Sequence, residues 1–151
     1  MRKRTEKEKE AMGRIVPVLE SLKIKKSTRS YVPLLDVMSY AAAYPDVEFR
    51  DIIEELLKQN SYVGVNTTDP NSENQILPAM VRTVETAFER SNSDRLKEIG
   101  MSEDVIVKIL DSDNYDESDL LQVLGEKYKK YTHEERIVYY FIKKVLKYLG
   151  Y

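Results

Sequence analysis

The chain of 151 residues contains no cysteine, and it has only five glycines and five prolines. The lack of cysteine excludes disulfides, thiolate nucleophiles and every cysteine-based zinc or iron–sulfur site. The five glycines are isolated from one another, so no glycine-rich phosphate loop is present. No apolar run approaches the roughly 18 residues that cross a bilayer, and residues 1–14 are charged and lack the apolar stretch of a secretory signal. These absences predict a cytoplasmic protein with no membrane partner.

Charge is abundant in the chain, but it is unevenly distributed. Residues 1–31 carry ten Lys and Arg against four Asp and Glu, a net charge of +6. Residues 32–121 carry seven against nineteen, a net of −12, and residues 122–151 carry seven against three, a net of +4. Nonspecific affinity for DNA comes mainly from Lys and Arg that neutralise phosphates. The acidic middle therefore opposes DNA binding, and the basic segments would have to supply it.

Apolar residues recur at helical spacing along most of the chain, which predicts an all-α fold with several helices. The expected helices span 5–22, 30–44, 45–58, 76–90, 93–100, 102–110, 116–130 and 132–149. Ser30 is the expected N-cap of the second helix, Pro45 or Asp46 opens the third, and Pro78 lies near the first position of the fourth. The irregular stretch after the third helix contains a short expected strand at 62–65.

The last helix has the clearest start signal in the sequence. Thr132 and Glu135 have the spacing of a capping box, in which each side chain bonds the backbone N–H of the other residue. Residues 137–149 are apolar on more than one face, and Gly150 has the position of a glycine that ends a helix. Because a helix that is apolar nearly all round is buried, this helix either docks on its own domain or pairs with a second copy in a symmetric dimer.

Three blocks occur in a fixed order: IVPVLESLKI at 15–24, SYVPLLDVM at 30–38 with Tyr44 beyond it, and AMVRTVETAFERSN at 79–92 with NTT at 66–68 upstream. Over residues 15–99 they resemble the DNA-binding effector domain of the stage zero sporulation protein A family, the response regulators that commit certain Firmicutes to sporulation. The resemblance implies a helix-turn-helix core whose second motif helix enters the major groove.

The resemblance also implies a division of the chain. Residues 1–14 would form a charged arm or a helix extension, residues 15–100 the effector-like domain, and residues 101–151 a C-terminal helical extension that packs on it. Six residues are the candidates for DNA contact. Those at the groove are Asn74, Gln75 and Arg82, and those on phosphates are Lys25, Lys26 and Arg29.

The candidate residues differ from the family pattern in their charge. Asn and Gln side chains pair bidentately with adenine, so Asn74 and Gln75 have suitable chemistry for base readout. The family begins its recognition helix with Ser- and Arg-rich residues, whereas 74–78 here carry no positive charge. Arg82 is the one cation in that half of the helix.

No catalytic, metal or cofactor site is expected. His133 is the only histidine, and no Ser or Cys partner pattern accompanies it. The acidic residues after Asp111 do not form a calcium loop, because its sixth and twelfth positions hold Asp116 and Gln122 where glycine and glutamate are required.

We therefore expect a non-catalytic transcription regulator that binds double-stranded DNA, needs no cofactor and takes no small-molecule substrate. The alternative is a helical protein-interaction module, built on a helix-turn-helix scaffold that has lost its DNA contacts. The acidic middle and the aromatic last helix favour this alternative, and a homodimer through that helix is one form of it. A hydrolase would require a pocket with convergent polar groups.

Overall fold

The computed structural model describes residues 3–27, 30–59, 72–90, 93–98, 100 and 117–151. Within these residues the protein is all-α, as predicted. The elements are α1 (Glu6–Ser21), α2 (Tyr31–Ala43), α3 (Phe49–Gln59), α4 (Ser72–Arg90), α5 (Ser93–Glu98), α7 (Glu117–Leu124), the 3₁₀ helix η1 (Glu126–Lys130) and α8 (His133–Tyr148). The strand expected at 62–65 and the helix expected at 102–110 lie outside the described residues.

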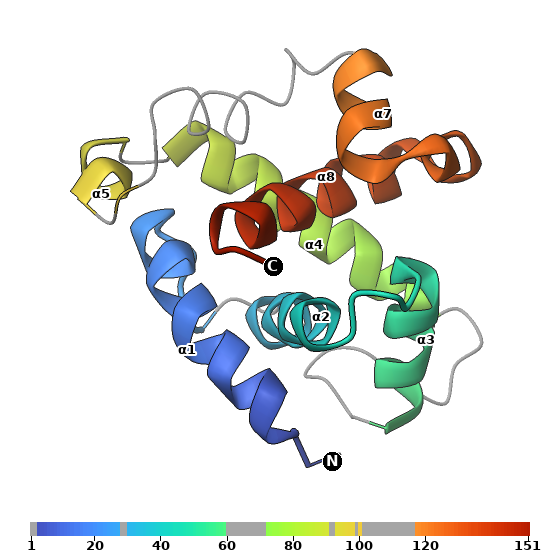
Figure 1. Ribbon diagram of the computed structural model, residues 1–151, viewed down its shortest axis with the longest axis horizontal. Coiled ribbons are helices and arrows are strands. Elements are labelled where there is room, and N and C mark those ends of the chain that lie inside the picture. The colour runs from blue at the N-terminus through green and yellow to red at the C-terminus, as the bar shows by residue number, and fades with distance from the viewer. Residues whose placement is uncertain (1–2, 28–29, 60–71, 91–92, 99, 101–116) are drawn as a thin grey trace.

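Two helices organise the core. α2 packs against α1, α3, α4 and α8, and Figure 1 shows it end-on between α1 and α3. α8 packs along α4 and also contacts α1, α2 and α7. The side chains of Val138, Tyr139, Phe141, Ile142 and Val145 on α8 are inaccessible to solvent. The apolar last helix therefore docks within its own chain, which is one of the two arrangements that its sequence allows.

α1 begins at a capping box that we did not identify in the sequence. The Glu8 amide donates to Thr5 Oγ1 at 3.3 Å, and the Thr5 amide donates to Glu8 Oε2 at 2.7 Å. The helix therefore includes residues 6–14 of the expected arm. The helix ends at Ser21, and Lys23, two residues later, is a non-glycine residue in the left-handed region with a φ of 61°.

The starts of α2 and α3 depart from expectation. Ser30 precedes α2, but its hydroxyl makes no capping bond to the helix backbone. α3 begins at Phe49, not at Pro45 or Asp46, because the chain first turns with the Val47 amide bonded to the Tyr44 carbonyl. The backbone carbonyl of Glu48 accepts the first helical hydrogen bond of α3, from the Ile52 amide. The side-chain carboxylate of Glu48 is bound by Lys127 and Tyr131, which come from the far end of the chain.

α4 begins at Ser72, so Pro78 lies inside the helix and the expectation that it would open the helix is wrong. A proline there removes one backbone hydrogen bond. Ile76, Met80 and Val84 are buried on both sides of it. The burial of these side chains offsets the lost hydrogen bond. A prediction of helix starts from neighbouring residues alone does not take such tertiary packing into account.

The helix expected over 116–130 is interrupted at Gly125. Gly125 has a φ of 77° and separates α7 from the 3₁₀ turn of η1. The final helix agrees with its predicted signals. The Glu135 amide donates to Thr132 Oγ1 at 3.2 Å, the Thr132 amide donates to Glu135 Oε1 at 2.7 Å, and Gly150 ends the helix with a φ of 91°.

Candidate nucleic-acid interface

Over residues 76–86, where its side chains are described, α4 presents a narrow solvent-exposed strip. Arg82, Glu85 and Thr86 are exposed, whereas Ala79, Met80, Val81, Thr83 and Val84 are buried. The strip is nearly neutral, because Glu85 offsets Arg82. Among the α4 side chains that the structure describes, Arg82 is the only cation. Position 75 lies two helical turns before position 82, so the α4 backbone brings both to one side of the helix.

A buried pair of hydroxyls joins the segment before α2 to α4. Thr83 Oγ1 donates to the Ala79 carbonyl at 3.1 Å, and it also lies within hydrogen-bonding distance of Ser30 Oγ. The single hydroxyl proton of Thr83 is donated to the Ala79 carbonyl. In the contact between the two hydroxyls, Ser30 is therefore the donor and Thr83 the acceptor. Ser30, which follows the basic connector of residues 23–29, therefore contacts α4 at the residue next to Arg82.

The six candidate DNA contacts are only partly described. Lys25 and Lys26 are exposed in the segment between α1 and α2, and Arg82 is exposed on α4. Asn74 and Gln75 lie in the first turn of α4, but their side chains are outside the described part of the structure, as is Arg29. α3 and α4 pack against each other, whereas residues 60–71 between them lie outside the described residues.

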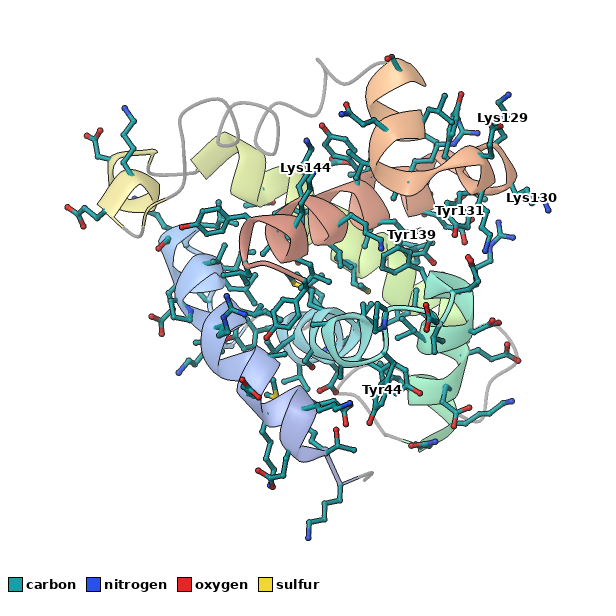
Figure 2. The ribbon with its side chains drawn as sticks, viewed as in Figure 1. Tyr44, Lys129, Lys130, Tyr131, Tyr139 and Lys144 are labelled. Atoms are coloured by element: carbon teal, nitrogen blue, oxygen red, sulfur yellow. The ribbon has the colours of Figure 1, made fainter. Side chains whose placement is uncertain are left out.

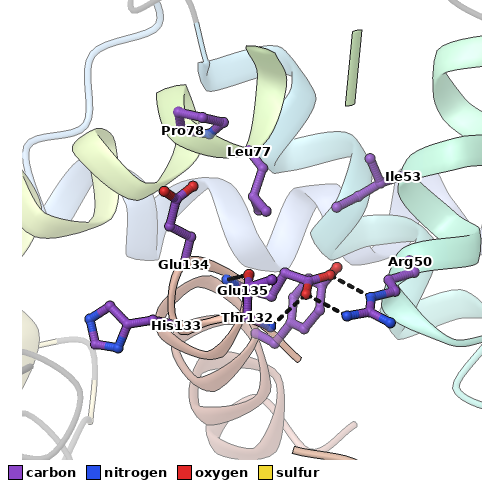
Figure 3. A pocket seen from close by; sticks show the side chains of 9 residues that line it. Arg50, Ile53, Leu77, Pro78, Thr132, His133, Glu134 and Glu135 are labelled. Atoms are coloured by element: carbon purple, nitrogen blue, oxygen red, sulfur yellow. Dashed lines mark hydrogen bonds and ion pairs between the residues drawn. The ribbon is translucent and has the colours of Figure 1, made fainter. Parts of the chain in front are cut away.

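A groove of about 650 Å³ lies between the first half of α4, α3 and the start of α8. The lining residues are Arg50, Ile53, Leu77, Pro78, Thr132, His133, Glu134, Glu135 and Tyr139. Figure 3 shows Glu134 directed toward Pro78. The groove therefore has apolar walls from α3 and α4, and an exposed carboxylate on its α8 side.

Beside this groove, a bidentate ion pair connects α3 to the start of α8. Arg50 Nε lies 2.6 Å from Glu135 Oε2, and Arg50 Nη2 lies 2.7 Å from Glu135 Oε1. The Glu135 side chain is only 8% exposed. Its hydrogen bonds from Arg50, and then from the Thr132 backbone, hold the pKa of this carboxyl below its usual value. Both oxygens of Glu135 are occupied, so we assign it a structural role.

A second carboxylate is held at the same junction. Tyr131 donates to Glu48 Oε2 at 2.6 Å, and Lys127 pairs with Glu48 Oε1. The hydrogen bonds from Lys127 and Tyr131 lower the pKa of Glu48. Burial, followed by the bond to Glu48, raises the pKa of Tyr131. The Tyr131 ring also packs edge-on against Tyr139 at 5.0 Å, so the residues around η1 are fixed to the core.

Sequence reasoning missed these polar contacts. The Thr132–Glu135 capping box was recognised, but nothing local indicates that Arg50 would bind Glu135 from 85 positions away. The lysines of η1 could have been found, because Lys127, Lys129 and Lys130 stand within four residues.

Within the described ranges, no group of three or more His, Asp or Glu side chains is placed to hold a metal ion. Over the same part of the chain, no helix is both long and apolar enough to cross a membrane. The exposed large apolar residues that the structure describes are scattered over the chain: Val32, Val47, Leu121 and Tyr151.

Comparison with known proteins identifies no relative. No protein-family model, no curated protein and no solved structure matches the chain. The resemblance to the sporulation effector domain therefore stays a prediction from the sequence blocks.

Proposed function

We propose that this protein is a non-catalytic DNA-binding transcription regulator of the sporulation-effector type. In this proposal, α3 and α4 take the place of the helix-turn-helix, and the exposed strip of α4 faces the major groove. Arg82, Asn74 and Gln75 contact bases in the major groove of the DNA. Lys25, Lys26 and Arg29 neutralise DNA phosphates.

The observation that carries the proposal is the contact between Ser30 and Thr83. It fixes Ser30, which follows the basic connector, against α4 at the residue next to Arg82. A groove-facing helix flanked by cations from a second segment has the arrangement that duplex recognition requires, with side chains for the bases and separate charges for the backbone. Glu85 on the same strip lowers the attraction, so we expect modest affinity at physiological salt.

Fluorescence anisotropy with labelled duplexes of mixed sequence, repeated across a salt series, tests this proposal. We expect binding that weakens steeply with salt. Arg82→Ala should weaken binding by about 1–3 kcal/mol, and Lys25→Ala/Lys26→Ala should lower the slope of log affinity against log salt by about 2. Lys9→Ala is a matched exposed control and should leave both affinity and slope unchanged, because Lys9 is 52% exposed and lies outside the proposed contacts. No binding at about 50 mM salt would exclude the proposal.

A second candidate function is a protein-interaction module, and the groove beside α4 favours it. Its wall contains Ile53, Leu77 and Pro78, and Glu134 stands at its edge. Sedimentation over a range of protein concentrations tests whether a second copy occupies the groove. A dimer that Leu77→Glu abolishes would support this function, whereas a monomer at every concentration would exclude a homodimer through this surface.

A further inference from the structure

η1 concentrates positive charge in one short turn. It has the sequence EKYKK, so three lysines and one glutamate give it a net charge of +2. A 3₁₀ helix has three residues per turn, so side chains three positions apart lie above one another. Lys127 and Lys130 therefore share one edge of the turn, and Glu126 and Lys129 share a second. Tyr128 stands on the third edge, where its side chain is buried.

The backbone of this turn is tied to the rest of the protein. Arg136 Nε donates to the Tyr128 carbonyl at 2.9 Å, and Arg50 Nη2 donates to the Lys130 carbonyl at 2.6 Å. The buried rings of Tyr128 and Tyr131 anchor the turn on its inner side. Three lysines held this close together repel one another, and an anion bound between them would relieve that repulsion. A fixed backbone also lowers the entropy lost when a ligand orders the side chains.

The lysine side chains are available to an external anion. Lys127 and Lys129 are 62% and 67% exposed, and their partners Glu48 and Glu126 are 36% and 80% exposed. The exposed pair of Lys129 with Glu126 contributes little to stability, so a phosphate can replace that carboxylate at small cost. Lys127 has three N–H donors and can bind a phosphate while it keeps its contact with Glu48. Figure 2 shows Lys129 and Lys130 at the outer edge of the molecule, with Tyr131 and Tyr139 behind them.

The position of the turn relates it to α4. η1 leads through Tyr131 into Thr132 and His133, which line the groove that Pro78 lines from the other side. Pro78 precedes Arg82 by one helical turn. The lysines of η1 are therefore connected through Tyr131 to one wall of this groove, and the exposed strip of α4 continues along the chain from the other wall.

We propose that Lys127, Lys129 and Lys130 form a basic knuckle that binds the phosphate backbone of duplex DNA beside the segment contacted by α4. The inference rests on the proposed DNA-binding function and adds a second contact to it. These residues lie outside the sequence blocks that resemble the sporulation effector domain, so the knuckle is a feature of the C-terminal extension. Because phosphates carry no sequence information, the knuckle would raise affinity equally for all sequences.

The test compares salt dependence in full-length variants, using two labelled duplexes of unrelated sequence. Lys127→Gln/Lys129→Gln/Lys130→Gln should lower the slope of log affinity against log salt by about 2 to 3, and equally for both duplexes. Lys129→Gln alone should lower it by about 1. Its matched control is Lys9→Gln, because Lys9 is 52% exposed and lies 3.5 Å from Glu6, three positions away, just as Lys129 lies 3.9 Å from Glu126. Thermal melting confirms that each variant is folded.

The outcomes separate the two proposals. An unchanged slope in the triple variant, with binding still weakened by Arg82→Ala, would overturn the knuckle and leave the proposed function standing. A reduced slope in the triple variant, with Arg82→Ala unaffected, would support the knuckle and contradict the role given to α4. No duplex binding by the wild-type protein at about 50 mM salt would overturn both. Binding to phosphatidylserine vesicles but not to duplex DNA would also overturn the knuckle as a DNA contact.

Discussion

The hydroxyl of Ser30 donates a hydrogen bond to the hydroxyl of Thr83, which lies 53 positions later in the sequence. The two residues are 2% and 9% exposed, so the bond is shielded from water. Through this bond, the residue that follows the basic connector is attached to α4, the helix that we propose enters the major groove of DNA. A change at either residue would therefore affect the placement of the connector as well as the stability of the fold.

The first prediction concerns this bond. Thr83→Val keeps the shape of the side chain but leaves the Ser30 hydroxyl buried without its acceptor, so we expect a loss of about 1–3 kcal/mol in the free energy of unfolding. The double variant Ser30→Ala/Thr83→Val removes both polar groups and should lose less than the two single losses combined. Urea unfolding of the four proteins measures the coupling. Strictly additive losses would show that the hydroxyls do not interact.

The second prediction concerns the ion pair between α3 and α8. Arg50→Ala leaves the Glu135 carboxylate with little exposure and without its bidentate partner, and we expect it to lower the free energy of unfolding by about 2 kcal/mol. Lys58→Ala breaks the exposed pair with Glu54 and should cost at most about 0.5 kcal/mol. Chemical denaturation of both variants at neutral pH tests the difference, and equal losses would contradict the structural role of the pair.

The third prediction is a loss of stability in acid. The folded protein lowers the pKa values of Glu135 and Glu48 below their usual 4.5. Each carboxylate therefore adds stability above about pH 4.5, and this contribution is lost as the pH falls through the lowered folded-state values. Urea unfolding at a series of pH values from 7 to 3 should show the decline. Glu135→Gln should be less stable than the wild-type protein at pH 7, and its free energy of unfolding should fall less between pH 7 and pH 3. A fall as large as that of the wild-type protein would contradict the stabilising role of the Glu135 carboxylate.

The fourth prediction concerns the end of α1. Lys23 adopts a φ of 61°, and the Lys23 and Ile24 amides bond the carbonyls of Glu20 and Leu19, which is the pattern of a Schellman motif. Glycine adopts this conformation without steric cost, so Lys23→Gly should raise the free energy of unfolding by up to about 1 kcal/mol. Thermal or chemical unfolding provides the measurement, and a clear loss of stability would contradict the assigned backbone.

Gly150 provides the matched control for that substitution. It occupies the equivalent position after α8, with a φ of 91° and the Gly150 and Tyr151 amides bonded to the carbonyls of Lys147 and Leu146. Gly150→Ala should therefore lower the free energy of unfolding by about 1 kcal/mol. The opposite signs expected at the two helix ends separate a backbone effect from a general response to substitution.

The parts of the fold that the sequence predicts correctly depend on local chemistry. The capping box of Thr132 and Glu135 and the terminal Gly150 lie within a few residues of the backbone groups that they organise. Apolar spacing likewise indicates the helices, because each stripe is a property of one segment. The sequence blocks place Arg82 on a helix, and its exposure agrees with the spacing of the buried residues around it.

The incorrect expectations have nonlocal causes. α3 begins later than predicted, where Glu48 is engaged by Lys127 and Tyr131 from the far end of the chain. Pro78 lies inside α4 because packing on both sides compensates for the bond that it removes. Arg50 could not be assigned to Glu135 from the sequence, because no periodicity relates residues 85 positions apart.

The central position of α8 has a consequence for how the protein folds. α1, α2 and α3 are neighbours in sequence and can associate early, but α8 can reach α1 and α2 only after a long stretch of chain has closed. α8 therefore reaches its partners late, and until then the surfaces of α1 and α2 that it covers stay open to water. We expect this helical protein to fold more slowly than one built from adjacent helices, with chain closure as the slow step.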